Sequence, residues 1–585
     1  MPLRRILRLA PWQVRSRIIR SVQRRVLPRV SEGQRLGVAR RLVSLSHPPQ
    51  LPLMRTPADS PTMRVRTGRG WVTARRDPAA SPASVRRQNL DTVTTALDTA
   101  GIDWFRVPAK ALRTTAVAVR VADRAAVLKI LEKSAGLVDI VKPKRAKKRA
   151  AALVLRVWWP VTDPHGSLVL GADVGCEIEF WSERDGVLAG PRTNPIAGVI
   201  AADEPVVTAP EPAFGAFSSP HDNTSYRTRE IFTMPGPDRI GFPIDVVYTW
   251  VDGSDLEWQA RKAAALGRND WLGEASRLAH NNSRFASRDE LRYSLRSLHC
   301  FAPWVNHIYL VTDDQVPEWL DPAAPGITLV SHREIFGDTG TLPTFNSQAI
   351  ESRLHRIPGL SEHFLYLNDD VFLGRPVSPE LFFTPGGLTR FFPSNAQVDA
   401  APRRPDDPPA DSAGKNNREL IRTAFGRVLS RKMMHTPHPS RISILREIEE
   451  RFSAYVSATA GHQFRHPDDI AMLSSLQQYY AYLTGRAAPG TIAYTYADLA
   501  NPATPFKLAR LLRHRDLDTF CLNDTDSDDA VAAEQVALLA EFLPAYLPFA
   551  SPYERTGAAP AVMPQRITVP AQQSPAKTRR RREFS

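Results

Sequence analysis

The sequence has little cysteine and no long apolar run. Its 585 residues include only three cysteines, Cys176, Cys300 and Cys521, which lie far apart and lack the close spacing of zinc ligands. A disulfide framework is therefore not expected, and the composition favours a reducing compartment such as the cytosol. No uninterrupted apolar stretch reaches the roughly 18 residues that a membrane-spanning helix needs. The N-terminus also lacks the continuous apolar core of a signal peptide.

The signatures of common nucleic-acid-binding motifs are missing as well. We find no helix-turn-helix, zinc-finger or RNA-binding pattern, and no internal repeat. The basic run KPKRAKKRA, residues 142–150, is either a nucleic-acid patch or a solvated loop, and we favour the loop. Nucleic acid is therefore not an expected partner.

Positive charge is what the chain has in excess. The net charge is +15 and the isoelectric point is near 9.9, which favours anionic partners such as nucleotide phosphates, polyanions or an acidic membrane surface. The N-terminus, MPLRRILRLAPWQVRSRIIRSVQRRV, places Ile18, Ile19, Val22 and Val26 at helical spacing among arginines. This segment is either a basic amphipathic helix lying on anionic lipid, a solvated arm, or a helix packed on its own domain. We therefore expect a cytoplasmic protein with an optional peripheral contact at the inner face of the cell membrane.

The chain is too long for one hydrophobic core, so several domains are expected. We predict a basic arm over residues 1–60, a small accessory α/β domain over 61–235, a main domain over 240–548 and a disordered basic tail over 549–585. Within the main domain, the Pro- and Asp-rich segment APRRPDDPPADSAG predicts a mobile loop over 398–414.

Strand and helix patterns alternate in the main domain. IDVVYTWV, HIYLVTDD, ITLVSH and HFLYLNDD read as buried strands, with helical patterns such as RDELRYSLRSLHCFAP between them. This alternation predicts an α/β fold with a mostly parallel sheet that is covered by helices on both faces. The later segments, such as SRISILREIEERFSAYVSATAG, predict a helical insertion. Ligands of such sheets bind beyond the carboxyl ends of the strands.

Acidic residues stand at these strand ends. Asp369 and Asp370 follow the apolar strand FLYL, and two adjacent carboxylates repel each other unless a proton or a cation lies between them. Their hard oxygen atoms suit Mg²⁺ or Mn²⁺ bound to a pyrophosphate. The alternative is a helix cap plus a surface acid. At a second strand end, Asp252 accompanies Gly253, which permits a tight turn close to a ligand. Nearby, Trp250 either stacks on a base or belongs to the core.

Further polar clusters follow in the helical part. HTPHPS contains His435 and His438, and FRHPDD contains Arg465 and His466. Histidine is the usual proton acceptor near neutral pH, and the guanidinium of arginine matches a phosphate. FCLND places Asn523 and Asp524 after another short apolar run. Lone histidines are more often structural residues, so these clusters alone do not establish a site.

Four of these blocks resemble the conserved blocks of the Stealth family of sugar-phosphate transferases. IDVVYTWVDGSD resembles the first block. The stretch from RDELRYSLRSLHC to HFLYLNDDVFLG resembles the second, HTPHPSRISILREIEERF with FRHPDDIAMLSSLQQYYAYLTG the third, and FCLND the fourth. Together they span residues 244–525, about half of the chain. The family includes bacterial capsule polymerases and the lysosomal-enzyme N-acetylglucosamine-1-phosphotransferase of animals.

The resemblance implies a fold and a reaction. The main domain would be nucleotide-sugar transferase-like. A nucleotide-sugar donor, a UDP-hexose or UDP-N-acetylhexosamine, would give its sugar-1-phosphate to a hydroxyl of a glycan acceptor in capsule or exopolysaccharide biosynthesis. A phosphodiester would form and UMP would leave, with Mg²⁺ or Mn²⁺ as the cofactor. The alternatives are a metal-dependent glycosyltransferase that releases UDP, and a non-catalytic binding protein.

The resemblance also implies roles for the candidate residues. Asp369, Asp370 and Asp524 would bind the metal, and Asp370 would also be a catalytic residue. Donor binding would fall to five residues: Trp250, Asp252, Gly253, Asn368 and Asn523. Arg465 would brace phosphate oxygens, and His438 or His466 would accept the proton of the acceptor hydroxyl or act as a nucleophile.

Overall fold

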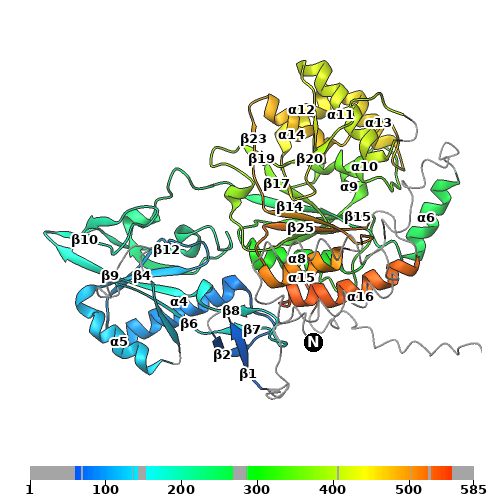
Figure 1. Cartoon of the computed structure of the whole chain (residues 1–585). Coiled ribbons are helices and arrows are strands. Elements are labelled where there is room, and N and C mark those ends of the chain that lie inside the picture. Colours follow the sequence, from blue (N-terminus) through cyan, green and yellow to red (C-terminus); the bar gives the residue numbers. More distant parts are fainter. Residues whose placement is uncertain are drawn as a thin grey trace, which may run out of the picture.

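The structure is a computed structural model that describes residues 60–67, 70–134, 136–141, 153–267, 285, 287–404, 407–501, 503–524 and 529–555, with backbone only over 529–534. The predictions made for the arm, for the run 142–150 and for the tail after residue 555 lie outside these residues. Figure 1 shows a smaller N-terminal body beside a larger one. No helix in the described part of the chain is long and apolar enough to cross a membrane.

The N-terminal body is built on two sheets. One has the order β1-β2-β7-β8, and the other has the order β11-β10-β9-β4-β3-β13-β12, with β6 paired to β9 and β5 to β6. The strands are β1 (Thr62–Thr67), β2 (Gly70–Arg76), β3 (Trp104–Val107), β4 (Thr115–Arg120), β5 (Leu137–Ile140), β6 (Val154–Trp158), β7 (Val161–Thr162), β8 (Val169–Leu170), β9 (Cys176–Arg184), β10 (Val187–Ala189), β11 (Val199–Ala201), β12 (Val206–Pro210) and β13 (Ser225–Arg229).

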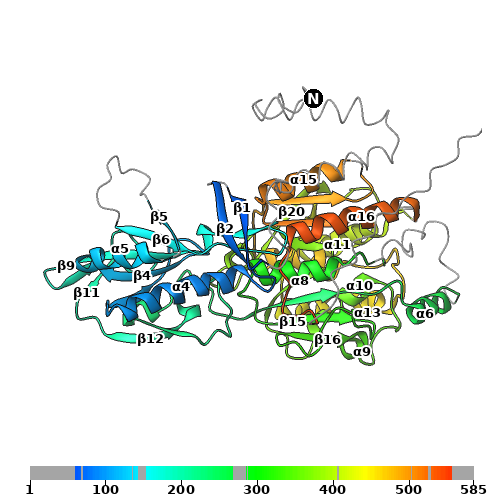
Figure 2. The same ribbon diagram turned by 90° about the horizontal axis from the view of Figure 1, so that it is seen from below.

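Two α-helices, α4 (Pro82–Thr99) and α5 (Arg124–Lys133), pack on the larger sheet. Helix α4 starts where the sequence supplies a cap: Ser81 and Ser84 form a reciprocal capping box, and Pro82 occupies the first turn, where its missing N–H costs nothing. Figures 1 and 2 show α4 directed toward the larger body. Val85 of α4 shares a core with that body, so the two bodies are packed together.

The larger body contains a five-stranded sheet of order β16-β15-β14-β17-β22. Its strands are β14 (Ile244–Thr249), β15 (Ile308–Thr312), β16 (Ile327–Ser331), β17 (His363–Asn368) and β22 (His438–Arg441). All neighbours are parallel except β17 and β22, which are antiparallel. The described part of the chain is therefore mixed α/β, as expected, and its central sheet is parallel except at one edge.

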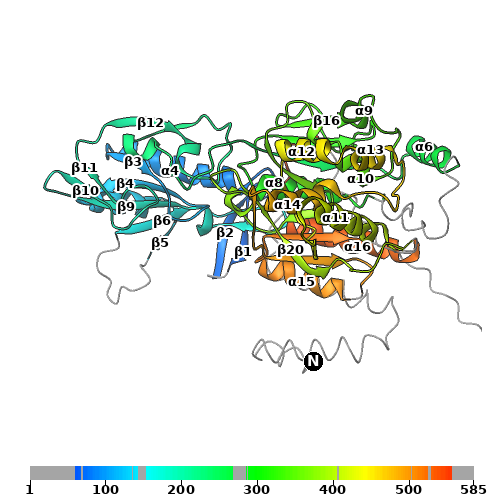
Figure 3. The same ribbon diagram turned by 90° about the horizontal axis from the view of Figure 1, so that it is seen from above.

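Helices cover both faces of this sheet because side chains alternate along its strands. In β14, Val246 and Tyr248 pack into one core with α8 (Glu290–Phe301), α15 (Thr504–His514) and α16 (Asp529–Tyr546). Val247 points to the opposite core, which the helical insertion supplies, as a period of two requires. Figure 3 shows the insertion helices above the sheet. They are α9 (His332–Phe336), α10 (Ser347–Glu351), α11 (Pro409–Phe425), α12 (Ile442–Arg451), α13 (Ser453–Gly461) and α14 (Gln477–Leu483).

A three-stranded sheet stands beside the end of β17. It consists of β18 (Val371–Leu373), β25 (Thr519–Asn523) and β24 (Tyr494–Asp498), with β25 in the middle. Two small sheets, β19–β23 and β20–β21, complete this part, with strands β19 (Thr389–Phe391), β20 (Pro393–Gln397), β21 (Arg431–Met433) and β23 (Ala487–Pro489). Helix α6 (Leu256–Leu266) follows β14. The chain turns directly from β17 into β18, so the residues between them lie where the two sheets meet.

Two predictions about irregular segments are corrected. The loop expected over 398–414 ends early, because α11 begins at Pro409; proline in the first turn starts a helix rather than preventing one. The tail expected from 549 does not begin there. Glu554 binds two arginines of α8 with side chains that are at most 11% exposed, and these ion pairs hold the segment on the larger body.

Candidate active site

A cavity of about 560 Å³ opens at the carboxyl end of β17, between the two sheets and the helical insertion. Five carboxylates line it: Glu290, Glu351, Asp369, Asp370 and Asp524. Its nitrogen-bearing lining includes Arg288, Asn368, Lys432, His435, His438, Arg465 and Asn523. The cavity therefore gathers charged groups from six separate stretches of the chain, at the place where parallel sheets bind ligands.

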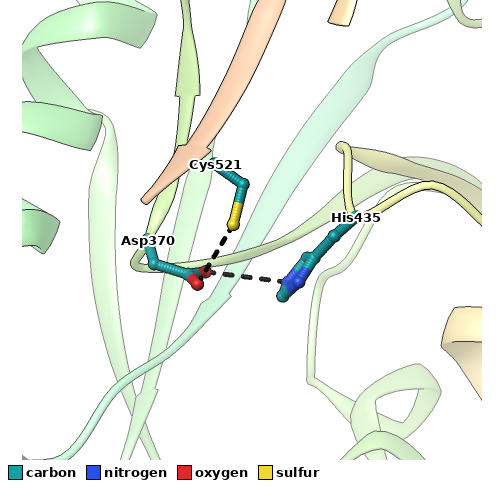
Figure 4. A group of neighbouring side chains, drawn as sticks. All are labelled: Asp370, His435 and Cys521. Atoms are coloured by element: carbon teal, nitrogen blue, oxygen red, sulfur yellow. Dashed lines mark hydrogen bonds and ion pairs between the residues drawn. The ribbon is translucent and has the colours of Figure 1, made fainter. Parts of the chain in front are cut away.

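Asp370 is the best connected of these acids. Its Oδ2 accepts a hydrogen bond from Asn523 Nδ2 at 2.9 Å and from Cys521 Sγ at 3.3 Å. Its Oδ1 lies 3.6 Å from Nε2 of His435 and accepts no hydrogen bond within the described residues. Figure 4 shows the three side chains converging from β25, from the turn after β17 and from the segment before β22.

These three residues have the spacing of a metal site, since their ligand atoms lie within 4.8 Å of one another. The sulfur is a poor ligand here. Burial raises the pKa of the Cys521 thiol well above its ordinary value, and Asp370 raises it further. Metals bind the thiolate, and this thiol stays protonated. The carboxylate of Asp370 and the imidazole of His435 are therefore the two groups of this cluster that can bind a metal or a proton.

Asp369 and Glu290 are two further acids of the cavity, and Oε1 of Glu290 lies 3.7 Å from Arg288 Nη1. Burial raises the pKa of Asp369 well above its ordinary value, and the neighbouring charges of Asp370 and Glu290 raise it further. The pKa of Glu290 rises to about 7, mainly through burial, although Arg288 opposes the change. Clustered acids of this kind mark a place where a cation would be stabilised.

Asp524 is different because it already has a partner. Its Oδ2 accepts a hydrogen bond from Arg288 Nη2 at 2.5 Å, and the two side chains are 2% and 5% exposed. Arg288 Nη2 also donates to Gln535 at 3.1 Å. A buried ion pair of this kind holds both side chains in place, so the charge of Asp524 is less available to a cation than that of Asp369 or Asp370.

The two histidines of HTPHPS differ in character. His438 is buried in β22 at the sheet edge, and its pKa falls to about 3 through burial and through the charge of His435. His438 is therefore a neutral imidazole at physiological pH. His435 is 30% exposed and lies beside Asp370, where a carboxylate can stabilise an imidazolium. His435 consequently has the better geometry for accepting a proton.

Arg465 reaches the cavity from the other side. Its Nη2 donates to Ser347 Oγ at 2.7 Å. Burial lowers the pKa of its guanidinium, and the charges of Glu351 and Asp469 act in the opposite direction. Glu351 itself accepts hydrogen bonds from the backbone N–H and the hydroxyl of Ser474. Ser474 belongs to a π-helical turn, Met472–Leu476, and such turns often occur at functional sites.

Four of the residues chosen from the sequence do not line this cavity. Trp250 is 7% exposed and belongs to the core. Asp252 accepts hydrogen bonds from Ser254, and an added Cβ at Gly253 would lie 2.3 Å from the carbonyl oxygen of Phe285. The glycine is thus required by close packing of the backbone. His466 stacks on a neighbouring histidine and pairs with Asp468.

Sequence reasoning also missed several residues that line the cavity. His435 has no role in the prediction from the sequence, although the repeated histidine in HTPHPS is a signal for it. Arg288, Glu290, Glu351 and Lys432 gave no local signal, because each is one charged residue in an ordinary helical or strand pattern. Their roles depend on contacts between segments that are distant in the sequence.

Comparison with known proteins identifies the family of the chain. Four family models match the chain: Stealth protein CR1, conserved region 1, over residues 242–270; CR2, conserved region 2, over 284–391; CR3, conserved region 3, over 434–482; and CR4, conserved region 4, over 509–564. The carboxylates, histidines and Arg465 of the cavity all fall within these ranges.

Three relatives illustrate the similarity. An exopolysaccharide phosphotransferase of Streptomyces coelicolor is 45% identical over 500 residues, which cover 82% of this chain and 84% of the relative. One from Nocardia farcinica is 38% identical, with 70% and 80% of the two chains covered. The exopolysaccharide phosphotransferase CpsY of Mycobacterium tuberculosis is 34% identical, with 77% and 81% covered.

Proposed function

The chain belongs to the Stealth family and is an exopolysaccharide phosphotransferase, and from this premise we propose that it transfers sugar-1-phosphate from a UDP-sugar to a hydroxyl of a glycan. A phosphodiester forms and UMP leaves. The observation that carries this proposal is the convergence of Asp369, Asp370, His435 and Arg465 on one cavity. We propose further that the larger body is a nucleotide-sugar transferase-like fold, since its cavity lies at the carboxyl end of the parallel strands.

A divalent cation, Mg²⁺ or Mn²⁺, fits the residues of this cavity. Oδ1 of Asp370 is buried and accepts no hydrogen bond within the described part of the chain. The raised pKa of Asp369 shows that like charges and burial oppose its ionised form. Asp369 and Asp370 would therefore hold the ion through hard oxygen atoms, with Asp524 nearby but already paired to Arg288. When bound, the ion supplies charge neutralisation for the oxygens of the donor diphosphate.

The protein's own residues position the reaction. Arg465, held by Ser347, would bind the oxygens of the phosphoryl group that is transferred. The acceptor hydroxyl attacks the phosphorus next to the donor sugar, and the bond from that phosphorus to the bridging oxygen breaks. UMP leaves with the bridging oxygen. His435 would take the proton of the acceptor hydroxyl, and Asp370, whose Oδ1 lies 3.6 Å from Nε2 of His435, would position the imidazole.

The acceptor would be selected by a wall that lies outside the four matched regions. Residues 392–433 separate the second region from the third, yet they supply Val398, Pro408, Pro409 and Lys432 to the cavity. Lys432 forms an ion pair with Asp411 of α11. This wall has apolar side chains and one cation, whereas the opposite side of the cavity carries the acids and Arg465 that would face the phosphates. We therefore assign the wall to the acceptor glycan.

The released nucleotide tests this function directly. Purified protein is incubated with a radiolabelled UDP-sugar, Mg²⁺ or Mn²⁺ and a glycan acceptor, and the products are separated by chromatography. UMP and a phosphodiester product are expected. UDP as the turnover product would contradict the proposal, because it would mean attack at the sugar carbon, as in an ordinary glycosyltransferase.

A further inference from the structure

A second cavity lies where the two bodies meet. Its volume is about 820 Å³. The N-terminal body contributes the start of α4 and residues 217–223, and the larger body contributes the end of α8, the approach to β15 and Tyr553. Figure 2 shows α4 of the N-terminal body and α8 of the larger body near each other at this junction. Clefts between packed bodies are common ligand sites, and nothing in the proposed transfer reaction uses this one.

The second cavity is separate from the candidate active site. Helix α8 reaches both, with Glu290 at the first cavity and His299 at the second. The two residues are nine positions apart, which corresponds to about 14 Å along a helix. Ile308 at the start of β15 lines the second cavity, whereas the first lies at the opposite, carboxyl end of the sheet.

The charges that line the second cavity cancel. Arg86 pairs with Glu211 at 2.5 Å, and Arg87 pairs with Asp222. Burial lowers the pKa of His299 to about 4, so its imidazole is neutral at physiological pH. Among the described residues of the lining, no arginine is left for a phosphate or nucleotide, which normally binds to unpaired cations.

Uncharged polar groups in this cavity lack partners. His299 and Tyr553 are both among the lining residues, and within the described residues neither the imidazole nor the phenol hydroxyl makes a hydrogen bond. His307 uses only Nε2, which contacts Thr328 Oγ1 at 2.8 Å. These rings offer both hydrogen-bonding atoms and flat apolar surfaces. A sugar matches them, because its hydroxyls donate and accept while its C–H face packs on a ring.

We propose that this second cavity binds a segment of an uncharged glycan at a distance from the reacting hydroxyl. This inference rests on the proposed function in one respect: we take the bound glycan to be the polysaccharide substrate of the transfer reaction. An uncharged part of the acceptor glycan held there would keep the acceptor on the enzyme, which raises the effective concentration of its reacting hydroxyl.

Binding can be measured without turnover by omitting the UDP-sugar. Neutral glucan, galactan and mannan oligosaccharides, and their parent polymers, are titrated into the full chain by calorimetry, with sugar phosphates as an anionic comparison. At least one neutral glycan should bind. Tyr553→Phe keeps the ring and removes one hydroxyl, and His299→Leu removes the imidazole; each should weaken binding about five- to tenfold.

Matched controls locate the site. Tyr496→Phe makes the same change in the first cavity and should leave this binding unchanged. The proposal is overturned if no neutral glycan binds, if only sugar phosphates bind, or if Tyr496→Phe weakens binding while Tyr553→Phe does not. Because UMP release with a short acceptor is measured separately, failure here is distinguishable from failure of the proposed transfer reaction.

Discussion

Replacing Glu554 by glutamine should destabilise the fold without touching the candidate active site. Oε1 of Glu554 accepts hydrogen bonds from Arg296 Nε and Ser551 N, and Oε2 accepts them from Arg292 Nε and Arg296 Nη2, at 2.7–2.8 Å. The acid and Arg292 are each 5% exposed. Glu554→Gln keeps the shape but removes the charge that two buried guanidinium groups require.

The magnitude follows from the pKa of the acid. The arginines lower the pKa of Glu554 from 4.5 to about 2, against the opposing effect of burial. A difference of about 2.5 pH units corresponds to about 3 kcal/mol of folding free energy at neutral pH. Because the folded pKa is depressed, this stability is present above about pH 4.5 and is lost as the pH falls toward 2.

Urea unfolding of both proteins, followed by tryptophan fluorescence, provides the measurement. Glu554→Gln should lower the free energy of unfolding by about 3 kcal/mol at pH 7, and the difference should shrink as the pH approaches 3. Glu318→Gln is a matched control, since Glu318 is exposed on a neighbouring segment, and its effect should stay within about 0.5 kcal/mol. A difference below 1 kcal/mol at pH 7, or one that does not change with pH, would refute the argument.

The remaining predictions concern function. Asp370→Asn should lower kcat about 10²- to 10³-fold with the fold intact by circular dichroism, because the charge that faces His435 at 3.6 Å is lost; unchanged UMP release would remove Asp370 from the site. His435→Gln should lower kcat more than His466→Gln, since only His435 lines the cavity, and equal losses would contradict that distinction. Lys432→Met should raise the KM for the acceptor and leave the KM for the UDP-sugar unchanged in initial-rate assays; a selective rise in the donor KM would assign this wall to the donor. Deletion of residues 1–30 should abolish sedimentation with anionic vesicles, and equal binding after the deletion would exclude the arm as a membrane contact.

Part of the fold could be predicted because the strands are strongly apolar. In β17 the run FLYL is fully buried, and the acids that follow it stand where the strand ends. The apolar run therefore predicted a buried strand of the sheet, and the polar residues after it predicted that Asp369 and Asp370 lie at the carboxyl end of that strand. The same rule failed at Asp252, whose backbone N–H and C=O are both bonded to Gln315, so that strand end is closed by its own hydrogen bonds.

Long-range pairs could not be predicted from local pattern. The ion pair of Arg288 with Asp524 joins residues 236 positions apart, and neither residue differs from an ordinary surface charge when read in the sequence. Composition was also misleading in the two irregular segments. Pro408 and Pro409 suggested a loop, although proline favours the first turn of a helix, and the polar C-terminal stretch concealed a Glu554 that is held by two arginines.

Helix α8 links these findings because its two ends reach different cavities. Arg292 and Arg296 are held by Glu554, and Ser294 and Ser297 are hydrogen bonded to β18 and to the helix itself. A helix packed so closely on all sides has no second conformation of similar free energy. A ligand shifts a conformation only by its differential affinity for two states, so a ligand in one cavity should not move α8 at the other. A glycan in the second cavity should therefore change the KM for a polymeric acceptor through tethering, while kcat with a short acceptor stays the same. A change in kcat on adding a non-reacting glycan would show that α8 moves, and the tethering explanation would have to be replaced by an allosteric one.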